Sequence, residues 1–132
     1  SLEPFSILEI EHILPNKPED DLRSKWATEN PGLVYDDYKN RLGNLTLLEK
    51  PINIVAGNDF YKDKKAEYSK SGNYLTRSLV ALTDVGQNTS ISRINAKLDA
   101  FPAWNAASIE KRHSMLIALA QDVWKTTPID VC

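Results

Sequence analysis

The chain has 132 residues, of which 42% are hydrophobic and 26% are charged, and its formal net charge at neutral pH is −2. This length and balance predict one globular domain with its own hydrophobic core, and they exclude a globally disordered chain. The slight acidity argues against a free-standing, high-affinity nucleic-acid binder, because such domains usually carry a strong basic excess.

The sequence holds few targeting or redox signals. No apolar run approaches the roughly 20 residues that span a bilayer, and no basic-then-apolar leader marks the chain for export. The single cysteine, Cys132, excludes a disulfide framework and a cysteine-based zinc site. We therefore expect a cytoplasmic protein, in which the glycosylation-like triplets at Asn44 and Asn88 are chance matches.

Apolar patterning and turn residues predict the elements of the first half of the chain. Residues 5–13 favour a strand that ends before Pro15, and residues 44–50 favour a second strand between Gly43 and Pro51. The helices expected in this half begin near Asn16 as a possible cap, cover 34–42 and stop at Gly43, cover 51–57, and run from Asp59 to about Ser69.

The second half of the chain is more plainly helical. Apolar residues recur at helical spacing within 75–82, 91–101 and 109–123, and the last of these helices begins near 105–108. Residues 83–90 form a loop that is too short to link two domains. We therefore expect an α+β fold that is mostly helical, with two short strands and a helix wrapped by about five further helices.

The stretch LEIEHILP, residues 8–15, places an acid beside an imidazole in an otherwise apolar strand. Taken alone, such a pair is more often structural, with Glu11 in water and His12 satisfied in the core. Two asparagines favour a functional site, because Asn44 opens the second strand and Asn53 follows it by nine residues on a helix. Each has a simpler alternative, since Asn44 follows a glycine as turn residues do and Asn58 competes with Asn53.

The order of these motifs resembles that of the ββα-metal, or HNH, nucleases. The closest resemblance is to the C-terminal HNH-like domain of GmrSD-type restriction endonucleases. That pattern is met here in order: EHILP, a tryptophan-bearing insert, LGNLTLL, an asparagine-bearing helix, and a stretch with Phe60, Lys64, Tyr68 and Ser71. The closing segment FPAWNAASIEKRHSMLIALAQDVW is similar to the last helix of the family. EHILP alone is a weak signal, but together with LGNLTLL at this spacing it is a strong one.

The resemblance implies a single HNH-like domain over residues 1–132 that is part of a larger prokaryotic defence protein. Its ββα-metal core of two antiparallel strands and a helix would cover about 5–70, and a helical extension would cover about 71–132. In that family an N-terminal NTPase-like domain senses modified DNA or controls the nuclease. The expected partners are therefore DNA and that domain, with no membrane, and the oligomeric state stays open.

By resemblance, His12 is the general base, Asn44 fixes the loop that bears it, and Glu11 and Asn53 hold one Mg²⁺ or Mn²⁺ ion. A histidine that titrates near neutrality suits proton removal from water, and a hard cation with oxygen ligands suits the clamping of a phosphate. Neighbours on a strand face opposite ways, so Glu11 and His12 share one site only if the chain bulges or turns there. Glu11 also departs from the Asp or His of many HNH nucleases.

Basic residues outnumber acidic ones by five to two within residues 60–77. Lys62, Lys64 and Lys65 are the candidates for contact with DNA phosphates, although a basic helix is usually just a solvated face. Two residues of the last helix are expected to be structural, namely Arg112 in an ion pair and His113 in a half-buried position.

The three tryptophans, Trp26, Trp104 and Trp124, are predicted to anchor the core. The resemblance implies a metal-dependent DNA endonuclease that cuts or nicks with little sequence choice of its own. A non-catalytic nucleic-acid-binding module and a protein-interaction domain are the alternatives. Neither explains why an acid–histidine pair and two suitably spaced asparagines occur together.

Overall fold

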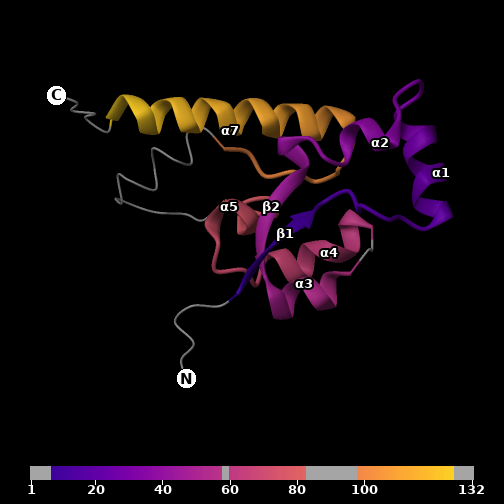
Figure 1. The fold of residues 1–132 in the computed structure, drawn as a ribbon, viewed down its shortest axis with the longest axis horizontal. Coiled ribbons are helices and arrows are strands. Elements are labelled where there is room, and N and C mark those ends of the chain that lie inside the picture. Colours follow the sequence, from indigo (N-terminus) through magenta and orange to yellow (C-terminus); the bar gives the residue numbers. More distant parts are fainter. Residues whose placement is uncertain (1–6, 58–59, 83–97, 127–132) are drawn as a thin grey trace.

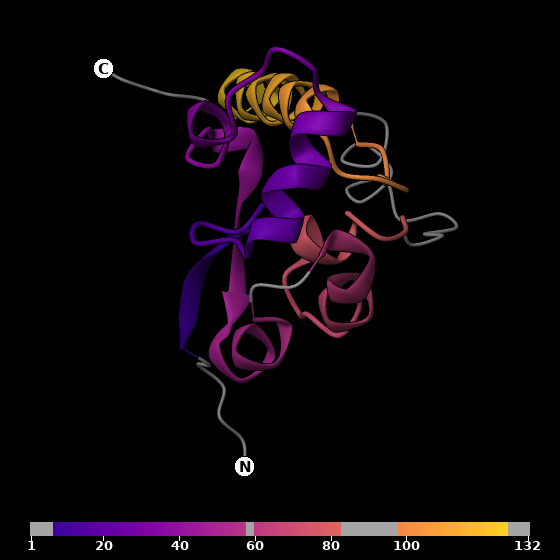
Figure 2. The same ribbon diagram turned by 90° about the vertical axis from the view of Figure 1, so that its right-hand side faces the viewer.

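The structure, a computed structural model, describes residues 7–57, 60–82 and 98–126. Its centre is a two-stranded antiparallel sheet of β1 (Leu8–His12) and β2 (Leu45–Glu49). The helices around it are α1 (Asp20–Glu29), α2 (Tyr35–Tyr38), the 3₁₀ turn η1 (Leu42–Asn44), α3 (Lys50–Ala56), α4 (Tyr61–Tyr68), α5 (Tyr74–Arg77) and α7 (Ala106–Thr126). The long helix α7 lies at the end of the sheet where β2 begins, and α3 and α4 lie towards the other end (Figures 1 and 2). The predicted α+β class and the antiparallel strand pair are thus confirmed.

The register of the two-stranded sheet decides which side chains face the helices. Leu8 pairs with Glu49 and His12 pairs with Leu45, without interruption between them. Because side chains alternate along a strand, Glu9 and Glu11 share the face that carries the buried Thr46 and Leu48 and that α3, α4 and α5 cover. The opposite face carries His12 and leaves Ile10 64% exposed.

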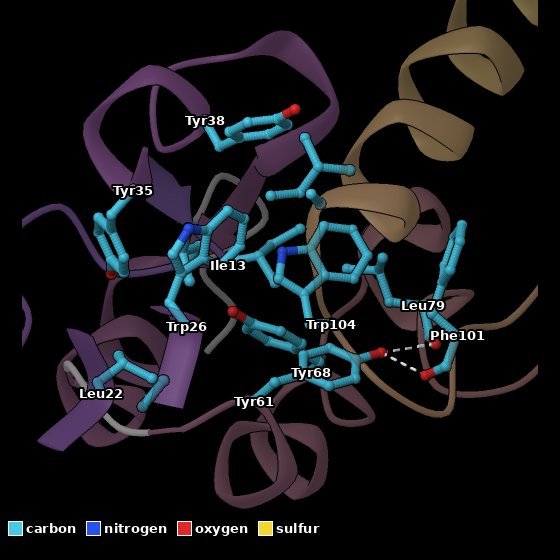
Figure 3. Packing of buried hydrophobic residues seen from close by; sticks show 14 of the residues in the cluster. Ile13, Leu22, Trp26, Tyr35, Tyr38, Tyr61, Tyr68, Leu79, Phe101 and Trp104 are labelled. Carbon is cyan, nitrogen blue, oxygen red and sulfur yellow. Dashed lines mark hydrogen bonds between the residues drawn. The ribbon is translucent and has the colours of Figure 1, made fainter. Parts of the chain in front are cut away.

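Aromatic side chains from distant segments form much of the core (Figure 3). Trp26 packs edge-on against Tyr35, and Tyr61 lies 5.4 Å from Trp104 between ring centres. The hydroxyl of Tyr61 donates hydrogen bonds to the carbonyls of Leu79 and Phe101, which satisfies its polar end inside the core. Such ring pairs contribute about 1 kcal/mol each beyond the area they bury. The core therefore joins α1 and α4 to the segment that leads into α7.

Two of the three tryptophans anchor this core as predicted, and the third does not. Trp26 and Trp104 are buried, whereas Trp124 is 68% exposed near the end of α7. The prediction was wrong for Trp124, because the last turns of α7 extend past the rest of the described chain, as Figure 1 shows, so none of the described core residues lies beneath them. In the ranges described above, none of the helices combines the length and the apolar composition that crossing a bilayer requires.

Several helices are shorter than the patterning predicted. Helix α1 begins at Asp20 rather than near Asn16, because Lys17 precedes a proline and is biased towards extended backbone. Only one helical turn, α2, forms within 34–42, and only α5 forms within 75–82. Residues 98–101 are not helical, while the expected loop at 83–90 and the helix over 91–97 lie outside the described residues.

Gly43 does not end a helix but lies inside η1, where the chain passes directly against α7. A side-chain carbon at this position would collide with the carbonyl oxygen of Ile109 and would lie 2.9 Å from the backbone nitrogen of His113. Glycine is needed here for close approach of two backbones, and not for a positive φ angle. The contact brings α7 next to the start of β2.

Gly43→Ala is expected to lower the free energy of unfolding by about 3 kcal/mol, the upper part of the usual range for overpacking. The added methyl group forces η1 and α7 apart, since backbone atoms on both sides cannot rotate away. Urea unfolding followed by circular dichroism measures the change. Gly72→Ala is the matched control, because its methyl group would meet only the Glu49 carboxylate at 3.3 Å. Equal stability of the two variants would contradict the close approach.

Candidate active site

Glu11 lies on the face of β1 that meets α4, and it is only 5% exposed. Its Oε2 accepts hydrogen bonds from Lys64 Nζ at 2.9 Å and from the Tyr68 hydroxyl at 2.6 Å. The same ammonium donates to the carbonyl oxygens of His12 at 3.0 Å and Ile13 at 3.2 Å. Burial raises the pKa of Tyr68 well above its usual value, and the Glu11 carboxylate raises it further, so the phenol stays protonated and donates. These contacts tie α4 to the end of β1.

Lys64 therefore lies in the interior, 1% exposed, and not on the surface where contact with DNA was expected. Helix α4 turns Tyr61, Lys64 and Tyr68 inward, at the spacing that places residues on one face of a helix. A lysine is tolerated at such a position because a carboxylate faces it there. Lys62 is exposed, whereas Lys65 is half-buried and donates to the carbonyl of Pro102 at 2.7 Å. Contact of these two lysines with DNA phosphates stays a prediction.

His12 lies on the opposite face of β1, half-buried, with its Nε2 3.0 Å from Oδ1 of Asn40. With that oxygen as acceptor, Nε2 carries the proton and Nδ1 is the basic nitrogen of the ring. The bulge or turn that was expected between Glu11 and His12 is absent, because strand pairing continues through both residues. The next residue, Ile13, extends the ladder by donating to the carbonyl of Asn44 at 2.9 Å. The side chains of Glu11 and His12 consequently lie on opposite faces of the sheet.

Asn44 is fully buried and hydrogen bonds in four directions. Its Oδ1 accepts from the backbone nitrogen of Leu14 at 2.7 Å and from the indole of Trp104 at 2.8 Å. Its Nδ2 donates to the carbonyls of Leu14 at 3.0 Å and Lys39 at 2.7 Å. These contacts hold the backbone of Leu14, two residues after His12. A contribution of Asn44 to catalysis stays a prediction.

Asn53 lies on α3, and its side-chain nitrogen donates to Oε1 of Glu9 at 2.8 Å. The sequence had paired Asn53 with Glu11, and Glu9 was not among the predicted site residues. The alternation of strand residues offered the missing signal, because Glu9 and Glu11 are two positions apart and therefore share a face. The structure thus brings Asn53 to a carboxylate of β1, but to the earlier of the two.

The donor set of this region suits a cation that needs few protein ligands. Among the described residues, no group of three or more His, Cys, Asp or Glu side chains is placed to hold a metal ion. Mg²⁺ usually keeps several waters and takes one or two oxygen ligands from the protein. The pair of Glu9 and Asn53 offers one carboxylate and one amide oxygen, which fits this coordination preference of Mg²⁺. The Glu11 carboxylate fits it less well, because an ammonium already neutralises it.

Arg112 holds the start of β2 from the side of α7. Its guanidinium donates to the carbonyls of Gly43 at 3.0 Å and Leu45 at 2.7 Å, and to the Thr46 hydroxyl at 3.3 Å. Among the described residues, these hydrogen bonds to neutral oxygens take the place of the expected ion pair. Burial lowers the pKa of Arg112 to about 10, so the group stays charged at neutral pH. His113, its neighbour on α7, is half-buried as expected.

Comparison with known proteins places this geometry in a family context. The family described as GmrSD restriction endonucleases, C-terminal domain, matches the chain over residues 2–119. No curated protein and no solved structure matches the chain significantly. The matched range includes both strands, helices α1 to α5, the first part of α7, and each of the site residues described above.

Proposed function

Because the chain belongs to the family formed by the C-terminal domain of GmrSD restriction endonucleases, we propose that it hydrolyses phosphodiester bonds in DNA with a histidine base and one divalent metal ion. Family membership supports nuclease activity and a DNA substrate. One structural observation supports the HNH type of chemistry. The second strand of an antiparallel pair runs directly into a helix, with His12 at the end of the first strand and Asn53 on that helix. That is the chain order of the ββα-metal fold.

In the proposed reaction, His12 takes a proton from the attacking water. Its imidazole is half-exposed and reaches solvent, while Asn40 orients the ring through Nε2. A positioned general base of this kind contributes about 10²- to 10⁴-fold to the rate. Asn44 holds the backbone of Leu14, two residues after His12, so the imidazole is carried by a fixed strand end.

Asn53 and a carboxylate of β1 would hold the divalent cation. Because these groups lie on the opposite face of β1 from His12, the proposed reaction requires the end of β1 to turn so that base and cation meet one phosphate. The sequence assigned this carboxylate to Glu11, but the contact at 2.8 Å favours Glu9. When bound, Mg²⁺ or Mn²⁺ neutralises a phosphate and orients the strand that is cut. Asn53 would offer Oδ1, and Glu9 either carboxylate oxygen, since both groups have more than one atom available.

Lys62 and Lys65 supply positive charge on the outer side of α4, and we propose that they contact DNA phosphates. Two such contacts give weak, salt-dependent binding. We therefore propose that most DNA affinity comes from the rest of a larger prokaryotic protein. In that protein an N-terminal NTPase-like domain would sense modified DNA in the cytoplasm or control the nuclease.

Relaxation of supercoiled plasmid tests the proposal. The protein is expected to nick plasmid in the presence of Mg²⁺ or Mn²⁺, and EDTA is expected to stop the reaction completely, because the phosphate then loses its counter-charge. Gel electrophoresis over time gives the rate. Nicking that continues in EDTA would contradict the metal requirement. Cleavage of RNA but not of plasmid would contradict DNA as the substrate.

A second candidate function is a nucleic-acid-binding module on a degenerate HNH fold. It is favoured by the position of His12 on the opposite face of the sheet from Glu9 and Glu11. This module would bind plasmid without nicking it under any metal condition. A gel-shift experiment beside the relaxation assay separates the two functions.

A further inference from the structure

We infer that Glu11, Lys64 and Tyr68 form a cluster that positions His12, and that Glu11 is the counter-ion of Lys64 and not a ligand of the cation. The inference rests on the proposed function, because it concerns the placement of the proposed base. It assigns a role to a buried lysine that has no place in the proposed reaction itself.

The ammonium of Lys64 contacts oxygens of three successive residues. These are Oε2 of Glu11 and the carbonyl oxygens of His12 and Ile13, at 2.9, 3.0 and 3.2 Å. An ammonium has three hydrogen-bond donors, so this arrangement matches its full donor capacity. The backbone of His12 is thereby fixed from α4, while its imidazole extends from the other face of the strand.

The cluster acts together with a second anchor. The Asn44 side chain hydrogen bonds to both the backbone nitrogen and the carbonyl oxygen of Leu14, two residues after His12. The backbone from His12 to Leu14 is therefore held by Lys64 at His12 and Ile13 and by Asn44 at Leu14. Since a misplacement of about 1 Å in a reacting group can cost roughly 10²-fold in rate, anchors of this kind matter for catalysis.

The ion pair with Lys64 argues against Glu11 as a ligand of the cation. Its side chain is nearly buried, and the side chain of Lys64 is entirely so. A cation bound at Glu11 would either displace the ammonium from the His12 carbonyl or lie within a few ångströms of it. Like charges at that separation repel strongly in a buried setting. Glu9 is free of this conflict, because within the described chain no salt bridge joins it to a lysine or arginine.

A double-variant experiment separates positioning from mere support of the fold. Lys64→Met and Glu11→Leu are each expected to lower the melting temperature, since each leaves the other charge buried alone. The double variant removes both charges and is expected to melt near the wild-type temperature. Its kcat for plasmid nicking is nevertheless expected to stay at least tenfold below wild type, with KM for DNA unchanged. Full recovery of kcat together with stability would overturn the inference.

Two readouts do not depend on nicking. The imidazole resonances of His12 are expected to shift in the double variant, while those of His113 stay in place as an internal reference. The affinity for Mn²⁺ in calorimetry is expected to match wild type in the double variant and to fall at least tenfold in Glu9→Gln. Unchanged His12 resonances, or loss of Mn²⁺ affinity in the double variant, would overturn the inference. A wild-type protein that does not nick would contradict the proposed function alone.

Discussion

Replacing His12 with alanine is expected to reduce the rate of plasmid nicking by about 100- to 10,000-fold, the usual contribution of a general base. The imidazole is the proposed acceptor of the proton from water. Its removal should leave the fold intact, because the ring is half-exposed and its one hydrogen bond described here is to Asn40 at 3.0 Å. The rate constant for loss of supercoiled plasmid, at saturating Mn²⁺, measures the effect.

The other histidine of the chain provides the matched control. His113 is half-buried on α7, and His113→Ala is expected to nick within a few-fold of the wild-type rate. Free imidazole added to His12→Ala is expected to restore part of the activity, because a small base can enter the space that the side chain leaves. A His12→Ala rate within tenfold of wild type would remove His12 from the role of base.

The largest loss of stability from a single polar residue is expected for Asn44→Ala. This substitution leaves the nitrogen and oxygen of Leu14, the carbonyl of Lys39 and the indole of Trp104 without their partner. Each buried group left unsatisfied costs about 1–3 kcal/mol, so we expect a total near 4 kcal/mol after relaxation. That is a large part of the roughly 5–15 kcal/mol that stabilises a typical domain. Urea unfolding, extrapolated to water, measures it.

Asn16→Ala controls for the loss of an asparagine as such, because Asn16 is exposed. Its stability is expected to stay within about 0.5 kcal/mol of wild type, as is usual at the surface. If Asn44→Ala were equally mild, the loop after His12 would be held by other contacts. Asn44 would then lose its proposed part in placing the base.

Much of the local structure could be predicted from sequence, because it depends on neighbours along the chain. Turn residues on both sides of LTLLE marked β2, and Pro51 sits in the first turn of α3. Family membership was also predicted, since EHILP and LGNLTLL at their spacing are specific to few families, and it is confirmed. The predicted helices that became single turns, α2 and α5, show the limit of patterning. A four-residue helix receives little stability from its own hydrogen bonds.

For the residues of the candidate site, too, local sequence patterns predict some features and only the tertiary structure shows the others. Strand alternation sets Glu11 and His12 on opposite faces, and only a bulge or turn between them would bring both to one site. The structure keeps the strand regular, because Ile13 continues the pairing past His12. Lys64 belongs to a basic stretch and was expected at the surface with Lys62 and Lys65. Only the docking of α4 against β1 shows that its ammonium meets a buried carboxylate.

By itself the sequence determined the class of fold, the family, the two strands, and the set of polar residues from which a site is built. These depend on residue type and spacing, which local backbone preferences and side-chain periodicity read directly. The tertiary structure alone decided which of those polar groups meet: Glu9 with Asn53, Glu11 with Lys64 and Tyr68, and His12 with Asn40. Such pairings join segments up to 57 residues apart. They follow from how the helices dock on the two-stranded sheet, because a charge can be buried only where an opposite charge or a hydrogen-bond donor reaches it.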